Sequence, residues 1–196
     1  NMSICYTNMN QPLGNSAGLW CEIVESIKCL KGDGPNDLME VVFLLGKKAL
    51  DMAGIDDARD KMNKVIQNGY ALNKFQEMVK SHGGDVTCID DYKTHNPKYC
   101  EKIYSNQDGF IYDINTLEIG KALNELGGSY ASNINKLDPT VGMHFFKKIG
   151  DSVESGEAVM EIFCSNLNKI THVKSYIANS ISITDNIKTD NQLIYK

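Results

Sequence analysis

Arginine is nearly absent from this sequence of 196 residues. Its twenty basic side chains comprise nineteen lysines and Arg59 alone, and with twenty-five acidic side chains the net charge is −5. Because arginine is the usual bidentate clamp on phosphate groups, the chain is poorly equipped to hold an anion with its side chains. The acidic balance also argues against a general nucleic-acid-binding surface, so we expect no nucleic-acid partner.

Long apolar runs and cysteine pairs are missing as well. No stretch approaches the ~18 consecutive apolar residues of a membrane-spanning helix, so we expect no membrane partner. The six cysteines form no Cys-x-x-Cys pair and no zinc-ligand spacing with histidine. We interpret them as free thiols of a cytoplasmic protein, in which such side chains behave as small hydrophobes.

Apolar residues in the first 84 positions recur with helical spacing. The pattern predicts four helices that each end near a glycine: 19–30, from Pro35 to Gly54, from 56 to Gly69, and from 71 to Gly83. The second helix has an apolar stripe that we expect to be its core face, formed by Leu38, Val41, Val42, Leu45, Ala49 and Met52. This region is therefore predicted to be a helical segment.

The pattern changes after Gly84. The polar, irregular stretch 85–97 is a predicted linker, and strand-like segments follow it. The expected elements are a hairpin of 99–104 and 110–114, a helix over 116–126, strands at 141–147 and 158–163, and a last helix carrying Ile170, Val173, Ile177 and Ile181. We predict an α+β protein with a helical part at 1–84 and a mixed module at 98–196.

Glycines punctuate the string Lys148-Ile149-Gly150-Asp151-x-Val153-x-x-Gly156-Glu157, which lies between the last two predicted strands. The string resembles the turn-and-strand pattern of biotinyl and lipoyl carrier domains. A carrier needs a modifiable lysine on an exposed hairpin after the second strand. The nearest lysine, Lys169, lacks Met or Asp neighbours of the expected kind, so we do not expect a prosthetic group.

A second resemblance covers nearly the whole chain. The segment Asn10-Gln11-Pro12-Leu13-Gly14 precedes the first predicted helix, and Leu30-Lys31-Gly32-Asp33-Gly34-Pro35 ends it. Both segments resemble the thymidine and pyrimidine-nucleoside phosphorylases, and 112–128 with 138–166 resemble the carboxy-terminal domain of that family. The resemblance implies that 1–84 is the helical rear part of an α/β phosphorylase domain, 85–97 a linker, and 98–196 a hammerhead-like barrel-sandwich domain.

The same resemblance implies a parent enzyme that cleaves pyrimidine nucleosides with phosphate as co-substrate, giving the base and a pentose 1-phosphate. The family's Lys-His-Ser, Ser-Gly-Arg-Gly-Leu and Gly-Gly-Thr-x-Asp segments do not occur in these residues. We therefore expect no catalytic residue in this chain, and an isolated chain that is inactive. We also expect its first residue to lie more than half-way along a homodimeric, cytoplasmic parent. The alternative is a non-catalytic structural or interaction module with a lipoyl-like fold.

A monovalent cation, usually potassium, is also implied by the resemblance. The family's Pro-Leu-Gly-x-x-x-Gly pattern places two backbone ligands at Leu13 and Ser16 and an acidic ligand at Glu25, with other ligands upstream. Hard cations take oxygen ligands, and a glycine-flanked turn can direct successive carbonyls inward. From its position alone, off the apolar face of its helix, Glu25 would be a solvated residue. The family commonly has Asp where this chain has Asn8.

Overall fold

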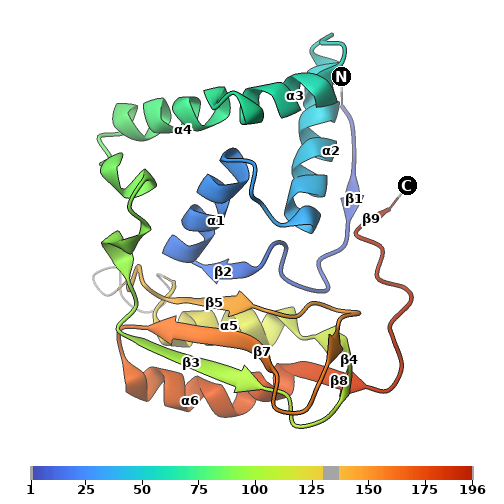
Figure 1. The fold of residues 1–196 in the computed structure, drawn as a ribbon, viewed down its shortest axis with the longest axis vertical. Coiled ribbons are helices and arrows are strands. Elements are labelled where there is room, and N and C mark those ends of the chain that lie inside the picture. Colours follow the sequence, from blue (N-terminus) through green and yellow to red (C-terminus); the bar gives the residue numbers. More distant parts are fainter. Residues whose placement is uncertain (1, 130–136, 196) are drawn as a thin grey trace. The chain divides into compact units, whose positions relative to one another are not determined.

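The computed structural model describes residues 2–129 and 137–195, which form a mixed α and β structure with three sheets (Figure 1). Its internal contacts divide the chain into two units. The first unit comprises Asn1–Thr7, Ile23–Thr94 and Leu193–Lys196, and the second comprises Asn8–Glu22 and His95–Gln192. The predicted α+β class is confirmed, whereas the hammerhead-like topology and the domain ranges stay predictions.

Helices make up most of the first unit, and they confirm the four predicted ones. The elements are α1 (Trp20–Leu30, in this unit from Ile23), α2 (Asn36–Met52), α3 (Ala58–Gln67), α4 (Tyr70–Ser81), the 3-10 turns η1 (Thr87–Ile89) and η2 (Tyr92–His95), β1 (Tyr6–Thr7) and β9 (Ile194–Tyr195). Helix α3 contacts both α2 and α4. Strands β1 and β9 pair antiparallel, so segments far apart in the sequence lie side by side.

The first unit buries few side chains. Its described buried apolar residues are Ile27, Cys29, Val41, Phe43, Ala58 and Ile89. The expected core face of α2 is largely wrong, because Val42, Leu45 and Met52 are 41%, 49% and 45% exposed. A helix stripe is buried only where another element covers it, and within the described residues nothing covers these three side chains enough to bury them.

The predicted linker contains the turns η1 and η2. Ile89 in η1 is only 1% exposed. The Lys31 ammonium, just after α1, donates to the Tyr92 hydroxyl at 2.9 Å and to the Ile89 carbonyl at 3.4 Å. These contacts attach residues 87–92 to the end of α1 within the first unit.

Two antiparallel sheets and two helices form the second unit (Figure 1). The larger sheet has the order β2 (Ser16–Gly18), β5 (Gly142–Phe145), β7 (Ala158–Cys164) and β3 (Tyr99–Tyr104). The smaller sheet has the order β6 (Ser152–Val153), β4 (Gly109–Ile114) and β8 (Ile181–Thr184). Helices α5 (Thr116–Leu126) and α6 (Leu167–Ile177) contact each other, and α6 also runs alongside β3 and β7.

Two expectations for this unit are wrong. Strands β3 and β4 exist but do not form a hairpin: β3 pairs with β7, and β4 pairs with β6 and β8. Between β3 and β4, the Ser105 amide donates to the Glu157 carbonyl and the Ser105 carbonyl accepts from the Gly156 amide. The chain then leaves the larger sheet before β4 begins in the smaller one. Ile181 does not extend the last helix, because it begins β8 opposite Ile114.

The second unit has an extensive core. Eighteen buried apolar residues from both sheets and both helices form one cluster, and Phe145, Met160, Ile162 and Ile170 are among its largest members. The helices begin at side-chain caps: the Asn115 side chain accepts from the Glu118 amide, and the Asn166 side chain accepts from the Asn168 amide. These caps satisfy amide groups in the first turn and so fix where each helix begins.

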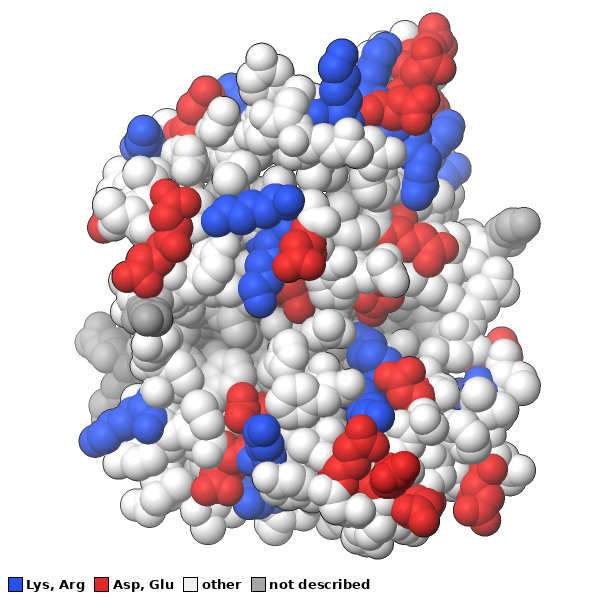
Figure 2. Space-filling view, viewed as in Figure 1, with Lys and Arg blue, Asp and Glu red and all other residues white. Residues whose placement is uncertain are grey.

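The surface carries charges of both signs. Figure 2 shows basic and acidic side chains interspersed on the face that it presents. The absence of a nucleic-acid partner stays a prediction. Among the helices of residues 2–129 and 137–195, none combines the length and apolar character needed to cross a membrane.

Candidate functional site

Residues 8–18 precede the helices of the first unit in the sequence, but they belong to the second unit. Strand β2 pairs antiparallel with β5, with Ser16 opposite His144. Gly14 is buried and has a φ of +71°. Gly18 has a φ of +152°, and a Cβ there would lie 2.5 Å from the Val141 carbonyl oxygen. Only glycine avoids both the strained backbone and this collision, so the two glycines shape the segment.

Four hydrogen bonds hold the turn between Gln11 and Asn15 to the strand β5 and the loop that follows it. The Ile149 amide donates to the Gln11 side-chain oxygen at 2.8 Å, and the Phe145 amide donates to the Asn15 carbonyl at 2.8 Å. The Lys148 ammonium donates to the carbonyls of Pro12 and Gly14. The turn is thus anchored on the second unit by backbone, amide and ammonium groups.

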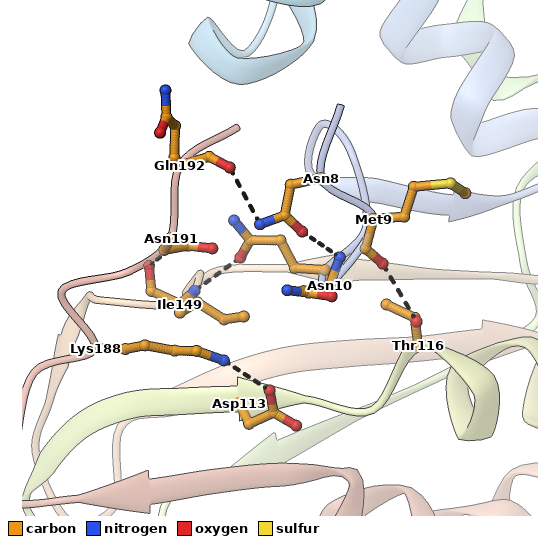
Figure 3. Close-up of polar contacts among 10 residues, drawn as sticks. Asn8, Met9, Asn10, Asp113, Thr116, Ile149, Lys188, Asn191 and Gln192 are labelled. Atoms are coloured by element: carbon orange, nitrogen blue, oxygen red, sulfur yellow. Dashed lines mark hydrogen bonds and ion pairs between the residues drawn. The ribbon is translucent and has the colours of Figure 1, made fainter. Parts of the chain in front are cut away.

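The carboxy-terminal tail meets the beginning of this segment (Figure 3). The Asn8 side chain donates to the Gln192 carbonyl at 3.2 Å and accepts from the Asn10 amide at 2.7 Å. The Asn191 side chain donates to the Ile149 carbonyl at 3.4 Å. An aspartate at position 8 could accept a hydrogen bond but could not donate one. The side-chain amide of Asn8 is therefore specifically suited to bind the Gln192 carbonyl.

Leu13 and Ser16 lie together in the second unit, three residues apart in the sequence. The Leu13 side chain is 39% exposed, and its backbone lies between the two carbonyls that Lys148 binds. Ser16 begins β2, the edge strand of the larger sheet. Both predicted backbone ligands therefore belong to one anchored turn-and-strand segment.

Glu25 lies on α1 in the first unit, so the three predicted ligands are divided between the two units. Its side chain is buried, at 8% exposure, and the expectation from sequence position alone that it is solvated is wrong. A buried carboxylate is costly unless charges or donors compensate it, so this burial distinguishes Glu25 from an ordinary surface residue.

The donor set of the predicted site is oxygen only. Within the described parts of the chain, no group of three or more His, Cys, Asp or Glu side chains is arranged to hold a metal ion. Two backbone carbonyls and one carboxylate are a different kind of set, which suits a hard cation of low charge better than zinc. The residue types therefore fit a hard cation in chemistry, and potassium stays a prediction.

Three of the six thiols, those of Cys21, Cys29 and Cys164, are poorly suited to nucleophilic chemistry. Burial raises the pKa of Cys21 to about 11. Burial also raises the pKa values of Cys29 and Cys164. Because the thiolate is the reactive form, these three cysteines are packed side chains at neutral pH.

Comparison with known proteins decides the family. The family described as "Pyrimidine nucleoside phosphorylase C-terminal domain" matches residues 110–184. A pyrimidine-nucleoside phosphorylase of Bacillus subtilis is 35% identical over 187 residues, which are 93% of this chain and 43% of the relative. Residues 110–184 therefore belong to this domain family, and the chain as a whole matches the carboxy-terminal portion of the pyrimidine-nucleoside phosphorylases.

Other relatives in this family give the same picture. A Staphylococcus epidermidis protein of the same name is 36% identical over 93% of this chain and 43% of its own length. A Geobacillus stearothermophilus protein, also so named, is 32% identical over 91% of this chain and 42% of its length. The chain thus spans less than half the length of these relatives.

The structure also reveals residues that sequence reasoning missed. Lys148 lies in the Lys-Lys-Ile-Gly-Asp string that resembles the family, yet its contact with residues 12–14 joins positions more than 130 apart in the sequence. Spacing along a chain carries no information on such a contact.

Proposed function

We propose that this chain is the carboxy-terminal portion of a pyrimidine-nucleoside phosphorylase, for which thymidine and uridine are candidate substrates. In the reaction a phosphate oxygen forms a bond to the anomeric carbon of the pentose. The bond from that carbon to the pyrimidine nitrogen breaks, and the base leaves with the bonding electrons and takes up a proton. The products are the free base and the pentose 1-phosphate, so phosphate is the co-substrate.

The observation that carries this proposal is the extent of the similarity. Relatives named pyrimidine-nucleoside phosphorylase match 93% of the chain, so both units are included and not only the carboxy-terminal domain. The family's anion-binding segments are not among these 196 residues, and only one arginine is present. We therefore assign the chemistry to the other part of the protein and expect the isolated chain to be inactive.

The exposed face of α2 supports the idea that the first unit is incomplete by itself. Val42, Leu45 and Met52 follow helical spacing and are each more than 40% exposed. A stripe of this kind on a helix is normally covered by another element. We assign the covering element to the part of the relatives that this chain does not span.

A potassium ion held by the carbonyls of Leu13 and Ser16 and the carboxylate of Glu25 is part of the proposal. The supporting observations are the oxygen-only donor set, the anchoring of residues 11–18 on the second unit and the burial of Glu25. Such an ion would supply positive charge near a phosphate site. A homodimeric, cytoplasmic parent follows from the family resemblance alone.

Phosphate-dependent base release tests the proposal. The polypeptide encoded together with its upstream residues is assayed with uridine and thymidine, with and without phosphate. We expect free base and pentose 1-phosphate only when phosphate is present, and none from the 196-residue chain alone. No turnover by a folded longer polypeptide would favour the alternative, a non-catalytic module. Turnover by the short chain would refute the assignment of the chemistry to the missing part.

A further inference from the structure

Lys148 binds the backbone on both sides of Leu13. Its ammonium donates to the carbonyl oxygens of Pro12 and Gly14, which are neighbours of Leu13 in the turn. Lysine carries three donors on a compact charge, so one ammonium can gather several carbonyls as a small cation does. We propose that Lys148 is the positioning residue of this turn, and that by fixing Pro12 and Gly14 it sets the direction of the carbonyls of Leu13 and Ser16. The second half of this inference rests on the proposed cation site.

The backbone of Lys148 is itself held firmly. Its amide donates to the Asp151 carboxylate at 2.8 Å, and the Asp151 amide donates back to the Lys148 carbonyl at 3.0 Å. The Gly150 amide donates to the Ile111 carbonyl of β4 at 2.8 Å, and the intervening Ile149 is buried. The side chain therefore starts from a tight turn fixed to the core of the second unit, which is what a positioning residue requires.

The register of β2 shows where the Ser16 backbone points. Two hydrogen bonds link β5 and the neighbouring residues to the β2 segment: Phe145 donates to Asn15, and Leu19 donates to Val141 at 3.2 Å. In an antiparallel pair such bonded positions alternate with positions whose N–H and C=O point the other way. Ser16 therefore directs its backbone groups away from β5, on the outer side of the edge strand β2. Gly18 lies two residues further along β2, so its backbone groups also point away from β5. Its amide donates to the Glu22 carboxylate at 2.7 Å.

These contacts divide the carbonyls of the turn into two sets. Those of Pro12, Gly14 and Asn15 are bound by Lys148 and Phe145 of the second unit. In the sequence, Leu13 lies between Pro12 and Gly14, and Ser16 directly follows Asn15. Because Lys148 supplies the charged donor to the first set, its loss should disturb the turn more than loss of a neutral hydrogen bond.

The neighbouring Lys147 is a matched control. Its ammonium donates to the Ser152 carbonyl at 2.8 Å and forms a 2.7 Å ion pair with Glu157, and it holds a different loop. Lys147→Met removes the same charge one residue away. If only Lys148→Met changes the protection of the turn, the effect comes from the contact with residues 12–14. If both variants change it equally, the effect comes from the lost charge.

Hydrogen exchange in the 196-residue chain tests the first half of the inference. The Phe145 amide, which donates to Asn15, reports on the turn. We expect Lys148→Met to speed exchange at this amide at least about tenfold, while the amides of β7 keep their protection and Lys147→Met stays close to wild type. Unchanged exchange in Lys148→Met, or equal loss in both variants, would overturn the inference.

Chemical rescue keeps the test decisive if Lys148→Met does not fold. Lys148→Ala retains the Cβ, and n-propylammonium supplies the missing stem and charge. Restored protection or refolding with n-propylammonium, but not with n-propanol at the same concentration, supports a positioning role. Failure of the cation to restore either property would contradict it.

The second half is tested in the longer polypeptide by titrating potassium. We expect Lys148→Met to raise the potassium concentration for half-maximal phosphorolysis at least about tenfold, with a smaller change in kcat at saturating potassium. A wild-type protein without phosphorolysis would mean that the proposed function has failed. An active wild type with the same potassium requirement in Lys148→Met would mean that only the positioning role has failed.

Discussion

The two units of this chain differ in how completely they bury their apolar residues. The second unit has eighteen described buried apolar residues in one cluster, whereas the first has six and leaves Val42, Leu45 and Met52 of α2 exposed. Hydrophobic burial is the main stabilising term in folding. The difference teaches that the second unit contains its own core, whereas the first leaves much of one helix face uncovered among the described residues.

Residues 8–22 belong to the better-packed unit although they precede the helices in sequence. They contribute β2 to the edge of the larger sheet and are fixed by Gln11, Lys148 and Asn8. The turn with Leu13 and Ser16 thus rests on the unit with the larger buried core. A ligand site gains from such support because its geometry is then set before binding.

The largest predicted effect comes from the core of the second unit. Ile162→Ala in β7, where the side chain is 0% exposed, should destabilise this unit by about 2–5 kcal/mol. Leu45→Ala on α2, 49% exposed, should cost less than about 0.5–1 kcal/mol. Urea unfolding followed by fluorescence of Trp20, the single tryptophan, measures the first, and helical circular dichroism the second. Equal losses would remove the contrast between the units.

A second prediction concerns the join between residues 8–18 and β5. Gly18→Ala should cost about 1–3 kcal/mol, because its φ of +152° is strained for alanine and the new Cβ would meet the Val141 carbonyl. Gly120→Ala is the control: it lies inside α5 with open space around the Cβ, and should be neutral or stabilising by up to about 1 kcal/mol. Thermal unfolding of both variants gives the comparison. A wild-type Tm in Gly18→Ala would show that β2 is not held as described.

A third prediction is a pH dependence inside the second unit. Burial raises the pKa of the Asp138 carboxyl, but hydrogen bonds from Ser165 and Thr140 more than offset this, so its pKa lies below the usual value. The folded state then favours the carboxylate. Its contribution is present above the unfolded pKa of about 4 and is lost as the pH falls through the folded pKa.

Asp138→Asn checks that dependence. At neutral pH it should cost about 1–3 kcal/mol, because charge-assisted bonds become neutral ones, and the difference from wild type should shrink toward acid pH. Denaturant unfolding between pH 7 and pH 3 measures it, with Asp33→Asn in the first unit as the control. A constant difference across this range would contradict the assigned role.

The smallest predicted effect concerns the tail. Asn8→Asp removes the donor to the Gln192 carbonyl and should loosen residues 185–195 by about 0.5–1.5 kcal/mol. Trypsin should then cut after Lys188 several-fold faster, since opening of the tail exposes that bond. Asn186→Asp, whose side chain is exposed in the same tail, serves as the control. Cleavage at the wild-type rate in Asn8→Asp would show that this contact does not restrain the tail.

The sequence by itself predicted the four helices, most strands of the second unit and the family. These features depend on local periodicity, on glycines that end helices and on contiguous motifs, all of which are properties of neighbouring residues. The resemblance of a short Pro-Leu-Gly pattern to the family predicted Leu13 and Ser16 as cation ligands, and that role stays a prediction. Glu25 was placed on the correct helix, although its burial could not be inferred from that helix alone.

Only the tertiary structure decided which elements pair. The adjacent strands β3 and β4 join different sheets, Ile181 begins β8 and does not extend the helix, and most of the expected core stripe of α2 is exposed. The contact of Lys148 with Pro12 and Gly14, and that of Asn8 with the tail, likewise join distant segments. Strand pairing, burial and long-range contacts depend on which elements pack against each other in the folded chain. The residues of one element do not specify its packing partner, so local sequence cannot predict these features.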